Sequence, residues 1–144
     1  MVRFPGPERI IHTQLAKLAR DVSFTQSENG LVKVAHAQSV ANFFSTNVVV
    51  IITVPGREQQ TMVGRDDITQ AALASLRTIA SLDVKFPDIV VTMAPGRNAA
   101  TVDVTVEAMV SGESDLIVQE MKFTFEKAGG RWLINRVETV RTLS

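Results

Sequence analysis

One histidine and one glutamine are the residues whose types and positions could do chemistry in this sequence. His36 falls on the flank of an expected helix, near Val32 and Phe43. A partly buried imidazole at such a place could titrate near neutral pH and transfer a proton. The alternative is a histidine that hydrogen-bonds at the border of the core, because the sequence assigns it no acidic partner. His12 lies beside polar positions of the first expected helix, which is typical of a surface residue.

Gln119 occupies the apolar phase of a strand pattern, and Met121 and Phe123 follow it in the same phase. Its amide is therefore expected to point inward, where a polar group needs hydrogen-bond partners. It could orient a ligand in a pocket, or it could lie at the end of the strand in contact with water. The sequence leaves both interpretations open.

The composition excludes several other kinds of site. The sequence contains no Cys and no Tyr, so a thiolate nucleophile, a Cys-ligated zinc and a tyrosine-based oxyanion hole are all ruled out. Two histidines without HExxH spacing do not indicate a zinc site. The turns at Gly56, Gly96 and Gly129–Gly130 lack the spacing of a phosphate-binding loop and are better interpreted as ordinary turns. We expect no metal and no cofactor.

The charge balance bears on the partners. Lys plus Arg and Asp plus Glu both number 15 in the 144 residues, so neither a nucleic-acid surface nor binding to an anionic membrane is expected. No apolar run approaches the roughly 20 residues that cross a bilayer. We expect a soluble chain whose partners are small molecules or proteins. The opening Phe4–Pro7 would also suit the first residues after a trimmed leader or anchor, so cytoplasmic and extracytoplasmic locations both stay open.

The spacing of apolar residues changes along the chain, and with it the kind of element that must position these side chains. The segments beginning near Pro7 and Leu31, and the one that Asp66 is expected to cap, have helical spacing. A β-branched run from Val48 to Val54 predicts a strand covered on both faces. The apolar stripe of the first helix comprises Ile11, Leu15, Leu18 and Val22.

After Leu82 nearly everything alternates as long strands. Phase shifts at Pro87–Asp88 and near Asn135–Arg136 predict bulges that curl the sheet. Helices laid across the concave side would leave a conical space, which is a usual place for a small-molecule site. The sequence therefore predicts a single α+β domain over residues 1–144, with three helices from the N-terminal half packed on a curved, mainly antiparallel sheet.

This order of elements resembles the nuclear transport factor 2-like superfamily, particularly its SnoaL-like bacterial members. The matching residues are Phe43–Phe44, Asn47–Val50, Val54–Gly56, Gly64–Ile68 and Gly129–Ile134. The resemblance implies a cone-shaped, cystatin-like fold with a pocket between helices and sheet, often dimeric through the sheet. The superfamily includes ketosteroid isomerases, dehydratases, polyketide cyclases and binding domains, and fold alone does not choose among them.

Two functional hypotheses follow. The first is a SnoaL-like domain without a catalytic set, because Tyr is missing, whose pocket takes a small hydrophobic ligand or which has an assembly role, as a homodimer. The second is a cofactor-independent isomerase, dehydratase or cyclase in which His36 is the acid or base and Gln119 orients a carbonyl. They differ in whether these two side chains must face one cavity. The predicted pocket residues are His36, Phe43, Gln119, Met121, Phe123 and Trp132.

Overall fold

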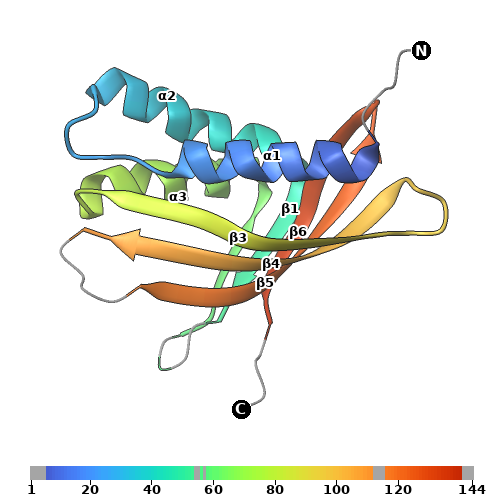
Figure 1. Cartoon of the computed structure of the whole chain (residues 1–144). Helices are drawn as coiled ribbons and strands as arrows, with labels where there is room; N and C mark the ends of the chain where they lie inside the picture. The colour runs from blue at the N-terminus through green and yellow to red at the C-terminus, as the bar shows by residue number, and fades with distance from the viewer. Residues whose placement is uncertain (1–5, 54–55, 57, 112–115, 141–144) are drawn as a thin grey trace.

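Three helices lie across one face of a curved six-stranded sheet (Figure 1). The computed structural model describes residues 6–53, 56, 58–111 and 116–140. The helices are α1 (Pro7–Val22), α2 (Gly30–Val40) and α3 (Gly64–Thr78), with a short 3-10 helix at Ala41–Phe43. The strands are β1 (Phe44–Ile52), β2 (Gln60–Val63), β3 (Leu82–Met93), β4 (Ala99–Val110), β5 (Ile117–Ala128) and β6 (Arg131–Thr139). The predicted α+β layer fold is confirmed.

The strands follow the order β2-β1-β6-β5-β4-β3. Only the pairing of β1 with β6 is parallel among the described strands, and the other pairings are antiparallel. Hence β2 and β3 are the two edges of the sheet. The mainly antiparallel sheet that the sequence predicts is confirmed, whereas the parallel contact joins strands far apart in the chain and leaves no local sequence signal.

Both predicted bulges are present. The pairing of β3 with β4 shifts register between Lys85 and Asp88, around Pro87, which cannot donate to the ladder. The pairing of β5 with β6 passes over Asn135 between Ile134 and Arg136. Each bulge shifts the alternation of side chains by one residue. Apolar side chains therefore stay on the concave face while the strands bend.

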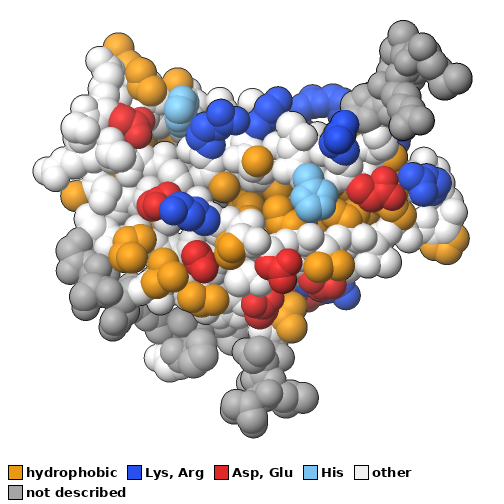
Figure 2. Space-filling model, viewed as in Figure 1, with side chains coloured by type: hydrophobic (Ala, Val, Ile, Leu, Met, Phe, Trp, Pro, Cys, Tyr) orange, Lys and Arg blue, Asp and Glu red, His pale blue; other side chains and the backbone are white. Residues whose placement is uncertain are grey.

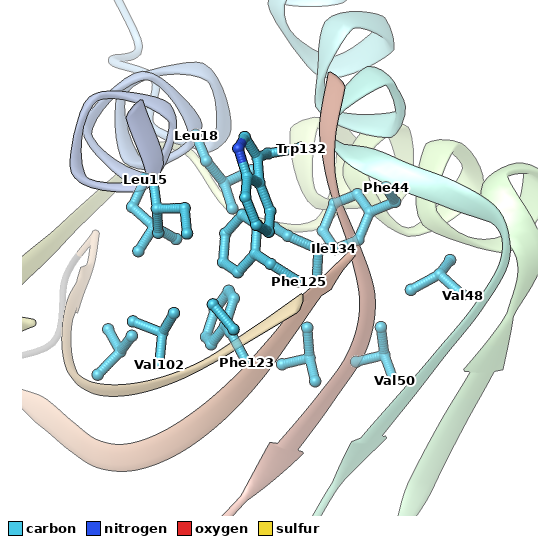
Figure 3. Close-up of a cluster of buried hydrophobic side chains, with 14 of the residues drawn as sticks. Leu15, Leu18, Phe44, Val48, Val50, Val102, Phe123, Phe125, Trp132 and Ile134 are labelled. Carbon is cyan, nitrogen blue, oxygen red and sulfur yellow. The ribbon is translucent and has the colours of Figure 1, made fainter. Parts of the chain in front are cut away.

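The core fills the narrow part of the space between the layers. The α1 stripe predicted from the sequence is confirmed, since Ile11 and Leu15 are fully buried and α1 lies against β3 and α2. Figure 3 shows Leu15 and Leu18 of α1 in the same buried cluster as Phe125 and Trp132 of the sheet. Some members of this cluster, such as Phe123 and Val137, also line the cavity described below.

Two local predictions are wrong. Asp66 does not cap α3: the N-cap is Val63, and the carboxylate Oδ2 of Asp67 accepts from the Val63 N–H at 2.9 Å. Gly64, with a φ of 84°, lets the chain turn into the helix directly after β2, so the helix starts earlier than predicted.

The strand predicted over residues 48–54 begins earlier, at Phe44, because the 3-10 turn closes the preceding helix. It is not fully covered on both faces, since Val48 and Val50 are buried but Val49 is only half-buried. Val54 lies outside the described residues.

A candidate ligand-binding cavity

A cavity of about 390 Å³ lies between the helical layer and the concave face of the sheet. Its volume is within the range of about 300–1,000 Å³ that is typical of small-molecule sites. Side chains of all three α-helices and all six strands contribute to its wall. Most of them are apolar, because the wall is formed by the inward faces of amphipathic elements.

The sheet side of the wall is set by alternation. Met121 and Phe123 of β5 project into it, as their phase in the sequence predicts, and so does Val106 of β4. The rings of Phe86 and Phe123 make an edge-to-face contact with centroids 6.1 Å apart and an interplanar angle of 67°. This contact fixes two of the larger side chains that line the cavity.

The helical side is built from small and aliphatic residues. Ala72 and Leu76 of α3 and Ala37 of α2 line it. The small side chains of Ala37 and Ala72 occupy little of the space between the helices and the sheet, which leaves room for the cavity.

The two serine hydroxyls of the wall are already engaged. The Oγ of Ser23 donates to the carbonyl oxygen of Ala19 at 2.7 Å and accepts from the N–H of Val84 at 2.9 Å. The Oγ of Ser75 donates to the carbonyl oxygen of Ala72 at 2.6 Å. Both serines therefore serve the local backbone.

Asp21 and Lys33 are the charged side chains of the described wall. Asp21 lies in the last turn of α1 and Lys33 in the first turn of α2, and both are half-buried. Neither takes part in a salt bridge within the described part of the chain. Sequence reasoning missed both residues. The sequence offered only a weak signal. Asp21 precedes Val22, the last residue of the buried α1 stripe, but the direction of the Asp21 side chain depends on the path of the linker that follows.

The other predicted pocket residues lie elsewhere. Phe43 packs half-buried against the core and does not line the cavity. Trp132 is only 4% exposed, belongs to the buried hydrophobic cluster (Figure 3) and does not line the cavity. The predicted positions of Phe43 and Trp132 in the pocket are therefore wrong. The phase of a residue in a strand or helix indicates the face on which it lies, but not where it lies along the space between helices and sheet. The binding roles predicted for Met121 and Phe123 stay predictions.

His36 lies in a different hollow. It lines an open groove of about 890 Å³ between the C-terminal half of α1 and the start of β3, together with Arg20 and Glu28. Figure 2 shows hydrophobic side chains in the seam between α1 and the sheet on this side of the molecule. Phe24 and Val84 line both the groove and the cavity, so the two hollows adjoin along this segment.

Gln119 is half-buried and lines neither hollow as the structure describes them. Its Nε2 donates to the backbone carbonyl oxygens of Glu120 at 3.0 Å and Val140 at 3.4 Å. The structure therefore does not bring His36 and Gln119 together in one cavity. Local backbone carbonyl oxygens accept from the Nε2 donor of this amide.

The described residues contain no cluster of three or more His, Cys, Asp or Glu side chains placed to hold a metal ion. None of the described helices combines the length and apolar content needed to traverse a bilayer.

Comparison with solved structures shows the fold. A provisionally assigned scytalone dehydratase from Novosphingobium aromaticivorans is 17% identical, with a TM-score of 0.71 over 94% of this chain and 84% of that one. A nuclear transport factor 2-like protein of unknown function from Pseudomonas putida is 9% identical, with a TM-score of 0.71 over 95% of this chain and 87% of its own. A protein of unknown function with a cystatin-like fold from Nostoc punctiforme is 13% identical, with a TM-score of 0.66 over 94% and 92%.

No protein-family model and no curated protein sequence matches the chain. The identities to the solved structures are low, and similarity at that level carries architecture rather than activity. The three helices, the strand order and these structural matches together show that the chain has the cystatin-like, α+β fold of nuclear transport factor 2-like proteins.

Proposed function

We propose that this protein binds a small hydrophobic molecule in the cavity between its helices and its sheet. The single observation that carries the proposal is the cavity itself, whose volume suits such a ligand and whose wall is almost entirely apolar. A space lined by apolar side chains forfeits dispersion contacts when it is empty. A ligand that fills it restores those contacts and removes apolar surface from water.

The separation of His36 from Gln119 supports binding over the catalytic alternative. General acid-base catalysis requires the acid or base within about 3 Å of the proton that it moves, or one water away. His36 lines the groove and not the cavity, and the Nε2 of Gln119 donates to backbone carbonyl oxygens. The pair on which the isomerase hypothesis depended therefore has no common substrate position.

A fluorescence titration tests the proposal. Phenylnaphthylamine is a neutral probe whose emission rises in apolar surroundings, and we expect saturable binding with one site per chain. Ala72→Phe places a ring in the cavity wall, because Ala72 lines the cavity from α3, and we expect it to weaken binding at least about tenfold. Ala35→Phe is the matched control, since Ala35 is exposed on α2 and lines neither hollow.

The outcome can contradict the proposal in two ways. Wild-type protein that gives no saturable signal would rule out a site for such ligands. Equal affinity in wild type and in a folded Ala72→Phe variant, with thermal unfolding as the check on folding, would show that the probe binds outside the cavity.

The assembly expected from the resemblance is a homodimer through the outer face of the sheet. What supports it is a row of side chains of alternating sign at paired positions: Asp103 of β4, Lys122 of β5 and Glu138 of β6. A two-fold axis midway between Asp103 and Lys122 would place each of these two side chains opposite the unlike charge of the other copy.

A further inference from the structure

We infer that the ligand of the cavity is a hydrocarbon-like molecule that carries no carbonyl or other hydrogen-bond acceptor in the part that the cavity encloses. This inference rests on the proposed function and adds the chemical class of the ligand. The grounds are the near absence of polar atoms from the wall and the engagement of the hydrogen-bond donors around it.

The wall presents carbon almost everywhere. Most of its side chains are aliphatic or aromatic, and almost no polar atom of the described residues borders the cavity. Asp21 and Lys33 belong to the wall, so what they contribute to its surface is chiefly carbon. A lysine stem commonly packs on apolar surface in this way while its ammonium group reaches water. A ligand in the cavity is therefore surrounded by carbon.

The hydroxyl donors next to the cavity already have acceptors. The hydroxyl of Ser23 donates to the carbonyl oxygen of Ala19 at 2.7 Å, and the hydroxyl of Ser75 donates to that of Ala72 at 2.6 Å. Because a hydroxyl has a single proton, neither serine can also donate to a ligand.

The backbone donors of the linker and of the start of β3 are paired as well. The N–H of Phe24 donates to the carbonyl oxygen of Leu82 at 2.8 Å, and the N–H of Leu82 donates to that of Phe24 at 2.9 Å. The N–H of Val84 donates to the Oγ of Ser23 at 2.9 Å. All four residues line the cavity, but none of these N–H groups is left for a ligand carbonyl.

A carbonyl enclosed by this wall would lose its water without a replacement. An acceptor without a donor in apolar surroundings is unfavourable. A bridging water would itself need about two to four polar partners, which the described wall does not offer. A hydrocarbon group gives up no hydrogen bond when it enters. A carbonyl substrate of the kind that the isomerase hypothesis requires is disfavoured for the same reason.

A matched pair of two-ring compounds tests the inference by displacement of phenylnaphthylamine. An apolar cavity of about 150 Å³ takes up benzene, so one of about 390 Å³ accommodates two such rings. Benzophenone has its carbonyl between the rings, where it cannot stay in water while both rings are enclosed. Its isostere has a methylene group in place of the oxygen.

We expect the isostere to bind wild-type protein more tightly than benzophenone. The ratio of their affinities should exceed the ratio of their octanol–water partition coefficients about tenfold or more, because octanol can donate a hydrogen bond to the carbonyl and the wall cannot.

Met62→Gln tests the cause of this preference. Met62 is half-buried and lines the cavity from β2, and glutamine keeps the length of the side chain while adding an amide donor. We expect the affinity ratio to narrow about threefold to tenfold, as one hydrogen bond allows. Met109→Gln is the matched control, because Met109 lines the groove and not the cavity, and it should leave the ratio unchanged.

Two results would overturn the inference while the proposed function stands, since the hydrocarbon isostere still binds in both. One is a wild-type affinity ratio at or below the octanol ratio. The other is a ratio that a folded Met62→Gln variant leaves unchanged, because the carbonyl would then not be short of a donor. If the isostere itself does not displace the probe, the proposed function fails and the inference fails with it.

Discussion

Phe24 and Leu82 are joined by two backbone hydrogen bonds of 2.8 and 2.9 Å, which fasten the linker after α1 to the first residue of β3. Because β3 is an edge strand, this bridge covers part of an otherwise open row of backbone groups. The same segment borders both the cavity and the groove that contains His36. One short linker thus protects the sheet edge and contributes to both hollows.

Ser23 completes this attachment, and its loss should be measurable. In Ser23→Ala the N–H of Val84 loses its hydroxyl acceptor, so we expect the free energy of unfolding to fall by about 1–3 kcal/mol. Denaturant unfolding measures the fall, and amide exchange at Val84 should accelerate. Ser39→Ala is the control because the Ser39 hydroxyl donates to the Ala35 carbonyl in an exposed bond. Equal losses in the two variants would contradict a special role for Ser23.

The N-terminus of α3 distinguishes two adjacent aspartates. Asp67→Ala removes the carboxylate that accepts from the Val63 N–H, and we expect it to cost about 1 kcal/mol of stability. Asp66→Ala should cost less, because no side-chain hydrogen bond to the helix end is lost and only its interaction with the helix dipole changes. Thermal unfolding of both variants measures the difference. A larger loss from Asp66→Ala would mean that the assigned cap is wrong.

Gln14 offers a stabilising substitution. Its Oε1 is buried without a hydrogen-bond partner in the described structure, and an unsatisfied buried acceptor costs about 1–3 kcal/mol. Gln14→Met keeps the length of the side chain and removes both polar atoms, so the unfolding free energy should rise. A fall in stability on chemical denaturation would show that the amide has a partner, such as a bound water.

The proposed dimer predicts a charge effect on the sheet. Lys122→Glu turns the row that it shares with Asp103 and Glu138 into three acids, which should dissociate a sheet-to-sheet dimer in low salt. Sedimentation velocity reports the change. Lys17→Glu on α1 carries the same charge change on the helical side and should leave the dimer intact. Wild-type protein that sediments as a monomer at high concentration would refute the proposed dimer.

Much of the architecture could be predicted because it depends on local periodicity. The α1 stripe around Leu15 and the phase shifts at Pro87–Asp88 and Asn135 are local, and all three are confirmed. The start of α3 was mispredicted because the carboxylate that bonds to the helix end belongs to Asp67, one residue after the predicted cap Asp66. Val63 gave no sign of being the N-cap, since its own side chain makes no capping bond.

The candidate site could be predicted only in part, because it depends on how separate elements dock. Strand phase correctly put Met121 and Phe123 on the concave face. It could not show that Trp132 in the same sheet packs in the buried cluster and does not line the cavity. Asp21 and Lys33 reach the cavity only because the linker and the two helix ends are placed beside it, a long-range property that periodicity does not encode.

Methionine-methyl NMR during titration with phenylnaphthylamine tests the binding proposal most directly. Met62 and Met121 line the cavity, Met109 lines the groove, and Met93 packs against the core away from both. Binding in the cavity predicts that the Met62 and Met121 methyl resonances shift together and saturate while those of Met93 and Met109 stay in place. A shift confined to Met109, or no saturable shift at Met62 and Met121, would contradict the account.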